Sequence, residues 1–391
     1  MIFASEISDL QLSLMIASAA LTLLATIAIL VRVLPLKRLF RKHNSETVSP
    51  VHPVSAAVII FTHDDDESLA EMLPQILGQQ YEPGFEVIVV NDGESSLVRD
   101  LVEQLTLCHP NLYFTAAPDG ARNLSRKKLA LTLGIKAARS QVVVLTTSAA
   151  RINSKLWLRS IMRHFDPDGA VDVVIGYANA PAYDDRSFGA RARAFDSMAH
   201  DLGWIAPAAA GRPWRGSEHN LAYRRELFFH NKGFSRHLNL RDGDDGIFIS
   251  EISRGYNTVA DLSNDSFVEV PGANISRALK DRLERHRFTK KFISRRPHLA
   301  GTVSTIAYFL APLPLVAVPF IGRLDTFGWI YLAAIFVCWY AAGMLWSIPV
   351  RAMHVRKLLF SIPLLAFTRP FRIFRRTASS MTRRSKRYTW E

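Results

Sequence analysis

Two adjacent carboxylates, Asp244 and Asp245, stand between glycines in the segment GDDG, directly before the apolar stretch 247–252. On a loop that begins a helix, one carboxylate can face solvent and act as a general base that takes the proton of a hydroxyl group. Its neighbour raises the pKa of this base, because like charges repel. The sequence is equally consistent with a capped helix start that has no catalytic role.

Three further polar segments each follow a short run of apolar, mostly β-branched residues. The runs 55–61, 85–90 and 141–146 have the length and composition of buried strands. The polar segments that follow them are THDDDE (62–67), NDGES (91–95) and TSAARINS (147–154). Because ligands of open parallel sheets bind beyond the carboxyl ends of the strands, these segments are predicted to border a ligand.

Two of these polar segments also have ordinary structural explanations. Asp64, Asp65 and Asp66 can cap the next helix, since a carboxylate at a helix N-terminus contributes ~0.3–1 kcal/mol. For these three acids both interpretations stay open. The triplet 91–93 (Asn-Asp-Gly) has the composition of a common turn. An acid in a turn at the end of a central strand is also where a nucleoside is held, so we favour a functional role for Asp92.

Segments with helical periodicity separate the predicted strands. They cover 68–79, 97–105 and 127–138, and one more strand is predicted over 112–116. Alternating strands and helices are typical of an α/β fold, in which helices cover both faces of a mostly parallel sheet. Such a sheet brings the polar segments after its strands to one edge.

Three apolar runs are long enough to cross a bilayer, whose hydrocarbon core takes ~20 helical residues. They cover 12–33, 299–321 and 327–350. A cleaved signal peptide is the competing interpretation of the first run, but such a peptide carries its positive charge before the apolar residues. Here the positive charge follows, at Lys37 and Arg38. We therefore expect transmembrane helices at both ends of the chain.

The charges around these runs agree on one topology. By the positive-inside rule, 1–11 is a short extracytoplasmic N-terminus, 34–53 is a basic cytoplasmic linker, and 54–298 is a cytoplasmic domain. The basic tail 351–391 is predicted to be an interfacial cytoplasmic segment held to anionic membrane lipids. Its position beside membrane helices disfavours a nucleic-acid partner. The protein is thus expected in the inner cell membrane as a multi-pass protein.

The two cysteines, Cys108 and Cys338, are too few for a disulfide framework or a thiolate metal site, which fits a reducing cytoplasm. The net charge of +13 mostly reflects the membrane topology.

The order and spacing of the polar segments resemble those of the family 2 glycosyltransferases, which are inverting, nucleotide-sugar-dependent enzymes of the GT-A fold. The resemblance is greatest to membrane-anchored bacterial members and covers about residues 54–290. It rests on the segments VIIFTHDDDESL, VIVVNDGESS, SRKKLALTLGIKAA, VVVLTTSAARINSKLWL, GSEHNLAYRRELFFHNKGF and GDDGIFISEISRGYNT. It implies that 54–298 is a Rossmann-like GT-A glycosyltransferase domain.

The resemblance also assigns roles to residues. Asp245 would be the general base that deprotonates the acceptor hydroxyl, with Asp244 beside it. Asn91 stands where members often have a second Asp. The residues that would border the nucleotide-sugar donor are Thr62, Asp64, Asn91, Asp92, Lys128, Thr147 and Ser148. Those that would shape the acceptor side are Gly216, Asn220 and Arg224.

Two departures from the family pattern qualify the expected chemistry. Members usually carry Asp-x-Asp after the fourth strand to hold Mg²⁺ or Mn²⁺ on the diphosphate, and such hard cations prefer charged oxygen ligands. The aligned residues here are Thr147, Ser148 and Ala149, so a Mg²⁺ or Mn²⁺ cofactor is not supported by the motif and no metal ligand is predicted. The Gln-x-x-Arg-Trp motif of processive synthases is also absent, which argues against polymer synthesis.

Two hypotheses follow from the missing carboxylates. The first is a hexosyltransferase-type glycosyltransferase that is metal-independent, or only weakly metal-dependent, and acts on a membrane-proximal glycan or lipid-linked acceptor of the cell envelope. In it, cations would stabilise the leaving diphosphate. The candidate cations are Lys127, Lys128, Arg151, Arg285, His286 and Arg287. The alternative is a catalytically silent, glycosyltransferase-like scaffold in a membrane glycan-assembly complex.

Overall fold

The chain folds into two compact units. The computed structural model describes residues 8–45, 54–118, 124–179, 187–272, 276–293, 299–322, 324, 326–355, 358 and 361–381. One unit contains Met1–Lys37, Arg186–Gly203 and His298–Arg384, and we call it the membrane unit. The other contains Arg38–Asp185, Trp204–Pro297 and Ser385–Glu391, and we call it the sheet unit.

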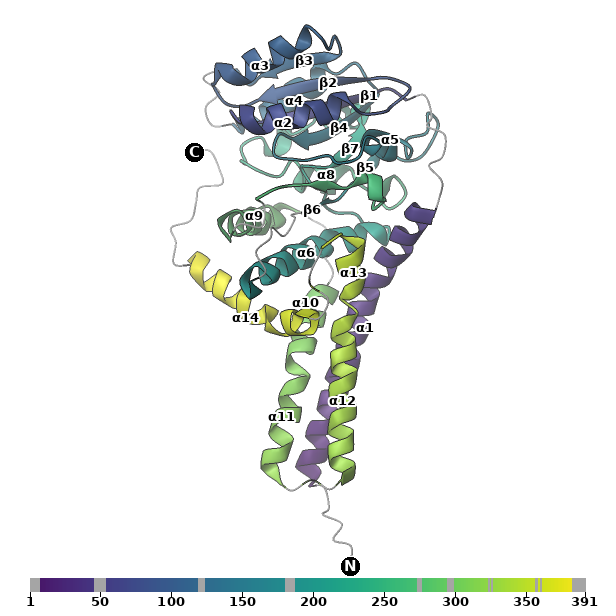
Figure 1. Ribbon diagram of the computed structural model, residues 1–391, viewed down its shortest axis with the longest axis vertical. Helices are drawn as coiled ribbons and strands as arrows, with labels where there is room; N and C mark the ends of the chain where they lie inside the picture. Colours follow the sequence, from purple (N-terminus) through teal and green to yellow (C-terminus); the bar gives the residue numbers. More distant parts are fainter. Residues whose placement is uncertain are drawn as a thin grey trace, which may run out of the picture. The chain divides into compact units, whose positions relative to one another are not determined.

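The sheet unit is built on a seven-stranded sheet with the order β3-β2-β1-β4-β7-β5-β8 (Figure 1). Its strands are β1 (Ala56–Thr62), β2 (Phe85–Asn91), β3 (Leu112–Ala116), β4 (Val142–Thr147), β5 (Val173–Ile175), β7 (Leu221–Arg224) and β8 (Thr258–Ala260). The first four run parallel, whereas β7 is antiparallel to both of its neighbours. A small second sheet pairs β6 (Ala178–Asn179) with β9 (Val268–Glu269).

Helices cover both faces of the sheet, as the alternation of strands and helices predicted. Along β1, Val58 and Ile60 join the core that contains Leu69 of α2 (Asp66–Leu77). Ile59 points to the other face and meets α4 (Arg126–Ala137), where a Cβ at Gly134 would lie 3.2 Å from it. Two further helices connect strands: α3 (Ser96–Thr106) joins β2 to β3, and α5 (Trp157–Met162) lies between β4 and β5.

The second half of the sheet unit consists of short elements around β7 and β8. These are the end of α6 (Phe188–Ala209), then α7 (Arg225–His230), α8 (Ile247–Ile252) and α9 (Ser276–Thr289), with single 3-10 turns at Ser235–His237, Asn264–Ser266 and Lys290–Phe292. The sequence-predicted helices and strands of the first half agree with the observed ones to within two residues at each end.

The last turn of α1 (Asp9–Ser45) packs against the loop after β8 within the sheet unit. His43 Nδ1 lies 3.3 Å from the carboxylate of Asp261, and His164 Nε2 lies 3.0 Å from it. Burial alone would raise the pKa of Asp261, but the hydrogen bonds from the two histidines outweigh it and hold the pKa well below its usual range. Asp261 thus anchors the end of α1.

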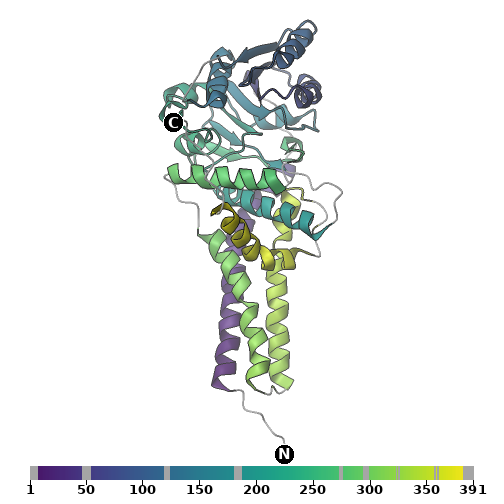
Figure 2. The ribbon, with the colours of Figure 1, turned by 90° about the vertical axis from the view of Figure 1, so that its left-hand side faces the viewer.

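The membrane unit contains most of α1, together with α10 (Ala300–Leu310), α11 (Pro312–Ile321), α12 (Thr326–Met344) and α13 (Ser347–Ala352). It also contains α14 (Ile362–Met381), which carries several arginines. The helices α1, α11 and α12 lie side by side (Figures 1 and 2) and share a core that includes Met15, Val318 and Ile335. Leu23 and Phe336 instead face outward and are exposed.

Three helical stretches are long and apolar enough to span a membrane: Asp9–Asn44, Ala300–Ile321 and Thr326–Ala352. They coincide with the three predicted runs. Outward apolar side chains along them would be unfavourable in water, which indicates association with a membrane. Within the expected domain 54–298, residues 186–203 group with the membrane unit.

The close approach of α4 to the sheet makes a testable prediction. A Cβ at Gly134 would lie 2.5 Å from a methyl carbon of Val90. Overpacking of this kind costs about 1–3 kcal/mol, although alanine is the better helix former. We expect Gly134→Ala to lower the melting temperature. Gly203→Ala is the matched control, because a Cβ there meets nothing within 4 Å. Equal or higher stability of Gly134→Ala would contradict this packing.

Candidate active site

The three predicted polar segments meet at one edge of the sheet. Thr62 pairs in register with Asn91, and Phe61 pairs with Thr147, so β1, β2 and β4 end together. Thr62 and Thr147 are buried there, and Ser148 donates its backbone N–H to the Phe61 carbonyl at 2.9 Å. The parallel arrangement therefore brings these loops into contact.

Asp64 ties the first two loops together. It adopts a positive φ of 50° and accepts hydrogen bonds from Asn91 Nδ2 at 2.8 Å and from the backbone N–H groups of Glu94 and Ser95. Burial raises the pKa of Asp64, but these hydrogen bonds outweigh that effect and lower it. A Cβ at Gly93 would lie 2.0 Å from the Asp64 carboxyl carbon. Asp64 and Asn91 therefore fix the loops after β1 and β2 against each other.

The neighbouring acids play different parts. Asp65 caps α2, since its carboxylate accepts the Ser68 N–H at 3.1 Å, so the helix-cap interpretation holds for this residue. Asp92 remains at the rim of the site, where its carboxylate lies 2.6 Å from His63 Nδ1. Its backbone carbonyl accepts from Arg126 Nε at 2.7 Å. Contacts to His63 and Arg126 thus hold Asp92 in place at the end of β2.

Lys128 does not turn toward the end of β4. Its side chain is fully buried, and its ammonium donates to the backbone carbonyls of His237 at 2.7 Å, Asp242 at 3.0 Å and Leu240 at 3.1 Å. Burial lowers the pKa of Lys128 to about 8. The Lys128 ammonium is therefore occupied by backbone carbonyls and does not face a donor phosphate at the end of β4. It holds the chain that leads into the Asp244 and Asp245 loop.

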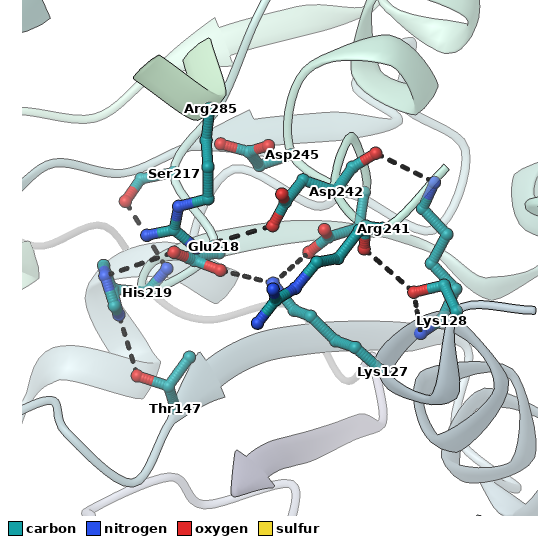
Figure 3. Close-up of polar contacts among 12 residues, drawn as sticks. Lys127, Lys128, Thr147, Ser217, Glu218, His219, Arg241, Asp242, Asp245 and Arg285 are labelled. Atoms are coloured by element: carbon teal, nitrogen blue, oxygen red, sulfur yellow. Dashed lines mark hydrogen bonds and ion pairs between the residues drawn. The ribbon is translucent and has the colours of Figure 1, made fainter. Parts of the chain in front are cut away.

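Lys127 occupies the centre of the site instead (Figure 3). Its ammonium forms an ion pair with Glu218, lies 3.0 Å from an Asp244 oxygen, and stands over the Phe61 ring at 5.3 Å. Burial lowers the pKa of Lys127, but the negative charges of Asp244 and Glu218 outweigh it and raise the pKa above its ordinary value. A fixed positive charge therefore stands among the carboxylates of the site.

Two basic side chains surround the carboxylate of Asp245. Arg215 Nη2 donates to its carboxylate at 2.9 Å, and His286 Nε2 lies 3.9 Å away. The Gly216 N–H donates to the Asp245 carbonyl at 2.9 Å, which joins the predicted base loop to the predicted acceptor-side segment. Burial, with repulsion from Asp244, outweighs the attraction of Arg215 and raises the pKa of Asp245. A raised pKa makes its carboxylate a stronger base.

The turn after β4 lacks the charge that a divalent cation requires. Thr147 Oγ1 is hydrogen-bonded to His219 Nδ1 at 2.7 Å, and burial lowers the pKa of this imidazole to about 4, so it is neutral at pH 7. Both carboxylates beside it, Glu218 and Asp244, are already paired with the Lys127 ammonium. These residues do not fit a Mg²⁺ or Mn²⁺ site.

Two residues predicted on the acceptor side lie elsewhere. Asn220 is fully buried, and its amide donates to the carbonyls of Tyr177 at 3.1 Å and Ser266 at 2.7 Å. Arg224 pairs in register with Val142 at the start of β4, because β7 runs antiparallel. It therefore lies at the opposite edge of the sheet from Thr147 and does not belong to this site.

Some of the predicted cations lie at the site and others do not. Lys127, Arg285 and His286 reach the site, and Arg285 Nη1 lies 3.4 Å from an Asp242 oxygen. Arg151 instead forms an ion pair with Glu71. Glu218 was not predicted, although it stands two residues after Gly216 in a segment that already carried the family resemblance. An acid two residues from a predicted site glycine was the available signal.

Comparisons with known proteins agree with this architecture. Residues 57–228 match the family model described as "Glycosyl transferase family 2". The mannosyltransferase PcManGT from Pyrobaculum calidifontis, solved with GDP-Man and Mn²⁺, has 19% identity and a TM-score of 0.52, over 87% of this chain and 97% of its own. S. aureus TarS 1–349 has 14% identity and a TM-score of 0.41, over 81% and 91%. No curated protein sequence matches the chain.

Residues 57–228 thus match the glycosyltransferase family 2 model, and the sheet unit has the GT-A fold.

The buried Lys128 ammonium makes the second prediction. Lys128→Met would leave several carbonyls of 237–242 without a donor, and each unsatisfied buried polar group costs about 1–3 kcal/mol. We expect a lower free energy of unfolding and faster proteolysis of 237–246. Lys136→Met, at an exposed position of the same helix, is the control. If both variants were equally stable, Lys128 would not hold this loop.

Proposed function

We propose that the protein is an inverting glycosyltransferase that moves a sugar from a nucleotide-sugar donor to a membrane-proximal acceptor without a divalent cation. The family 2 match supports the reaction class. The similarly folded PcManGT binds GDP-Man, which supports a nucleotide sugar as donor. The observation that carries the proposal is the Lys127 ammonium, paired with Glu218 and Asp244 at the end of β4.

The proposed reaction is a single displacement. Asp245 takes the proton of an acceptor hydroxyl, and the oxygen forms a bond to the anomeric carbon as the bond from that carbon to the diphosphate breaks. The configuration inverts, because the oxygen attacks from the face opposite the leaving group. The diphosphate departs with negative charge, which positively charged groups fixed in advance can stabilise.

Lys127 and Arg285 are the cations placed for this stabilisation. Lys127 is fixed by its two acidic partners, so little reorganisation is needed when charge develops. Arg285 has more freedom, since 38% of its side chain is exposed. Burial lowers the pKa of Arg285, but Glu218 and Asp242 outweigh it and keep the guanidinium charged. Both side chains would offer positive charge to the leaving diphosphate, the role that a metal ion has in metal-dependent reactions of this kind.

The acceptor is inferred from the membrane helices. Three stretches of the chain can span a membrane, and the domain that carries the site is covalently joined to them. A catalytic domain tethered in this way meets membrane-bound hydroxyl groups far more often than soluble ones. We therefore propose a lipid-linked or other envelope glycan as acceptor, with the site in the cytoplasm of a multi-pass inner-membrane protein.

The third prediction tests the base. Removing a general base lowers turnover by roughly 10²–10⁴-fold. We expect that loss in Asp245→Asn, with nucleotide-sugar turnover in the wild type unaffected by EDTA. Asp168→Asn, which changes an exposed carboxylate that makes no described contact with Asp245, is the control. Strict dependence of the wild type on Mg²⁺ or Mn²⁺ would contradict the proposed metal-independent reaction.

The fourth prediction concerns pH. Asp245 must be ionised to act, so kcat/KM is present above its raised pKa and is lost as the pH falls through that value. The positive charge of Arg215 lowers this pKa. Arg215→Met should therefore move the acid limb of the kcat/KM profile to higher pH. Arg212→Met, at an exposed neighbour, should leave the limb in place. An unmoved limb in Arg215→Met would exclude Asp245 as the titrating group.

A second candidate function has its own observation. Asp244 and Asp245 are both paired with cations, Lys127 and Arg215, an arrangement that is stable without any substrate. A silent scaffold for glycan assembly would need only this stability. Glycan synthesis in cells separates the two candidates. Asp245→Asn should abolish the product if the protein is an enzyme and leave it unchanged if the protein is a scaffold.

A further inference from the structure

Arg32 is a buried cation of the membrane unit that forms no ion pair with any carboxylate in the described part of the chain. It lies on α1 with only 8% of its surface exposed. Among the residues that the structure describes, its guanidinium contacts the Ser304 hydroxyl at 3.4 Å and stands over the Trp346 ring at 5.5 Å, and no acid forms an ion pair with it. Burying a charge without a counter-charge is costly, so buried charges are normally paired.

A second guanidinium reaches the same turn of α10. Arg369, on α14, donates from Nη1 to the Thr305 hydroxyl at 3.0 Å, and its Nε has no hydrogen-bond partner among the described residues. Ser304 and Thr305 are adjacent, and both of their hydroxyls donate to the Gly301 carbonyl. Two guanidinium groups and two hydroxyls therefore gather at one point within the membrane unit.

The nearest carboxylate to Arg369 is already occupied. Asp196, on the part of α6 in this unit, accepts from Arg372 Nε at 2.9 Å and Nη2 at 2.8 Å, and from Arg376 Nη2 at 2.6 Å. Arg369 Nε is 4.0 Å from the same carboxylate. One negative charge thus serves three arginines. Among the described residues, the positive charges of Arg32 and Arg369 thus exceed the negative charge that faces them, and a bound anion would balance the difference.

The chemistry of this anion follows from its surroundings. Guanidinium groups are the donors that bind phosphate oxygens best. The hydroxyls of Ser304 and Thr305 accept from the two guanidinium groups and so orient them. Arg32 ends an apolar run of the length that crosses a bilayer, and basic residues follow it, which places it at the depth of lipid headgroups. Trp346 beside it is typical of the same depth.

We propose that Arg32 and Arg369, which the hydroxyls of Ser304 and Thr305 orient, bind the phosphate of an anionic phospholipid headgroup. The site is independent of the glycosyltransferase activity proposed above, because none of its residues contributes to the sheet edge. The bound lipid neutralises the two guanidinium groups and thereby stabilises the packing of α1, α10 and α14.

Thermal unfolding of the purified full chain in detergent tests this inference. Phosphatidylglycerol should raise the melting temperature of the wild type by several degrees, whereas zwitterionic phosphatidylcholine and inorganic phosphate should not. Arg32→Gln and Arg369→Gln should lose this rise. Arg32→Gln removes a charge with no described ion-pair partner, and Arg369→Gln leaves Asp196 paired with Arg372 and Arg376, so both variants should still fold in lipid-free detergent. Arg38→Gln, at an exposed position of α1, should keep the rise.

Native mass spectrometry of the same samples should retain bound phosphatidylglycerol on the wild type and on Arg38→Gln, but not on Arg32→Gln. The inference is overturned if both lipids stabilise the wild type equally, or if Arg32→Gln responds as the wild type does. A rise produced equally by inorganic phosphate would overturn the assignment to a lipid and indicate a soluble anion.

Discussion

The site depends on one interaction, the burial of the Lys127 ammonium between Glu218 and Asp244. Each of these groups alone would be unstable in so enclosed a position, because a buried charge without a partner costs several kcal/mol. Together they fix the start of α4, the loop before β7 and the Asp244 and Asp245 loop around a single charge. A covalently attached cation therefore stands among the acids of this site.

The neighbouring lysine explains why this arrangement is rigid. Lys128 follows Lys127 on the same turn but points into the protein, where it satisfies the carbonyls of 237–242. Ser125 adds to this by capping α4 and donating to the Arg241 carbonyl at 2.9 Å. One helix start therefore positions both the central cation and the loop that carries Asp245. Although Thr147, Ser148 and Ala149 stand where the family pattern has Asp-x-Asp, the contacts of Thr147 with His219 and of Lys127 with its acids hold the loops at this end of the sheet together.

The sequence predicted the fold well because the periodicity of buried strands and amphipathic helices is a local property. It also predicted which loops meet, since parallel strands end at one edge. It could not predict the direction of Lys128, which is set by carbonyl groups more than 100 residues away. Nor could it show that β7 reverses direction, which places Glu218 and His219 at the site and sends Arg224 to the far edge. Glu218 became recognisable only through its contact with Lys127.

The central claim is that Lys127 provides the positive charge that a metal ion would otherwise supply to the diphosphate. Titration calorimetry with a panel of nucleoside diphosphates (UDP, GDP, CDP and TDP) in EDTA tests it most directly. The account predicts that the wild type binds at least one of them with an affinity that Mn²⁺ does not improve, and that Lys127→Met loses at least about tenfold, or ~1.4 kcal/mol. Binding that appears only when Mn²⁺ is added, or that is unchanged in Lys127→Met, would contradict it.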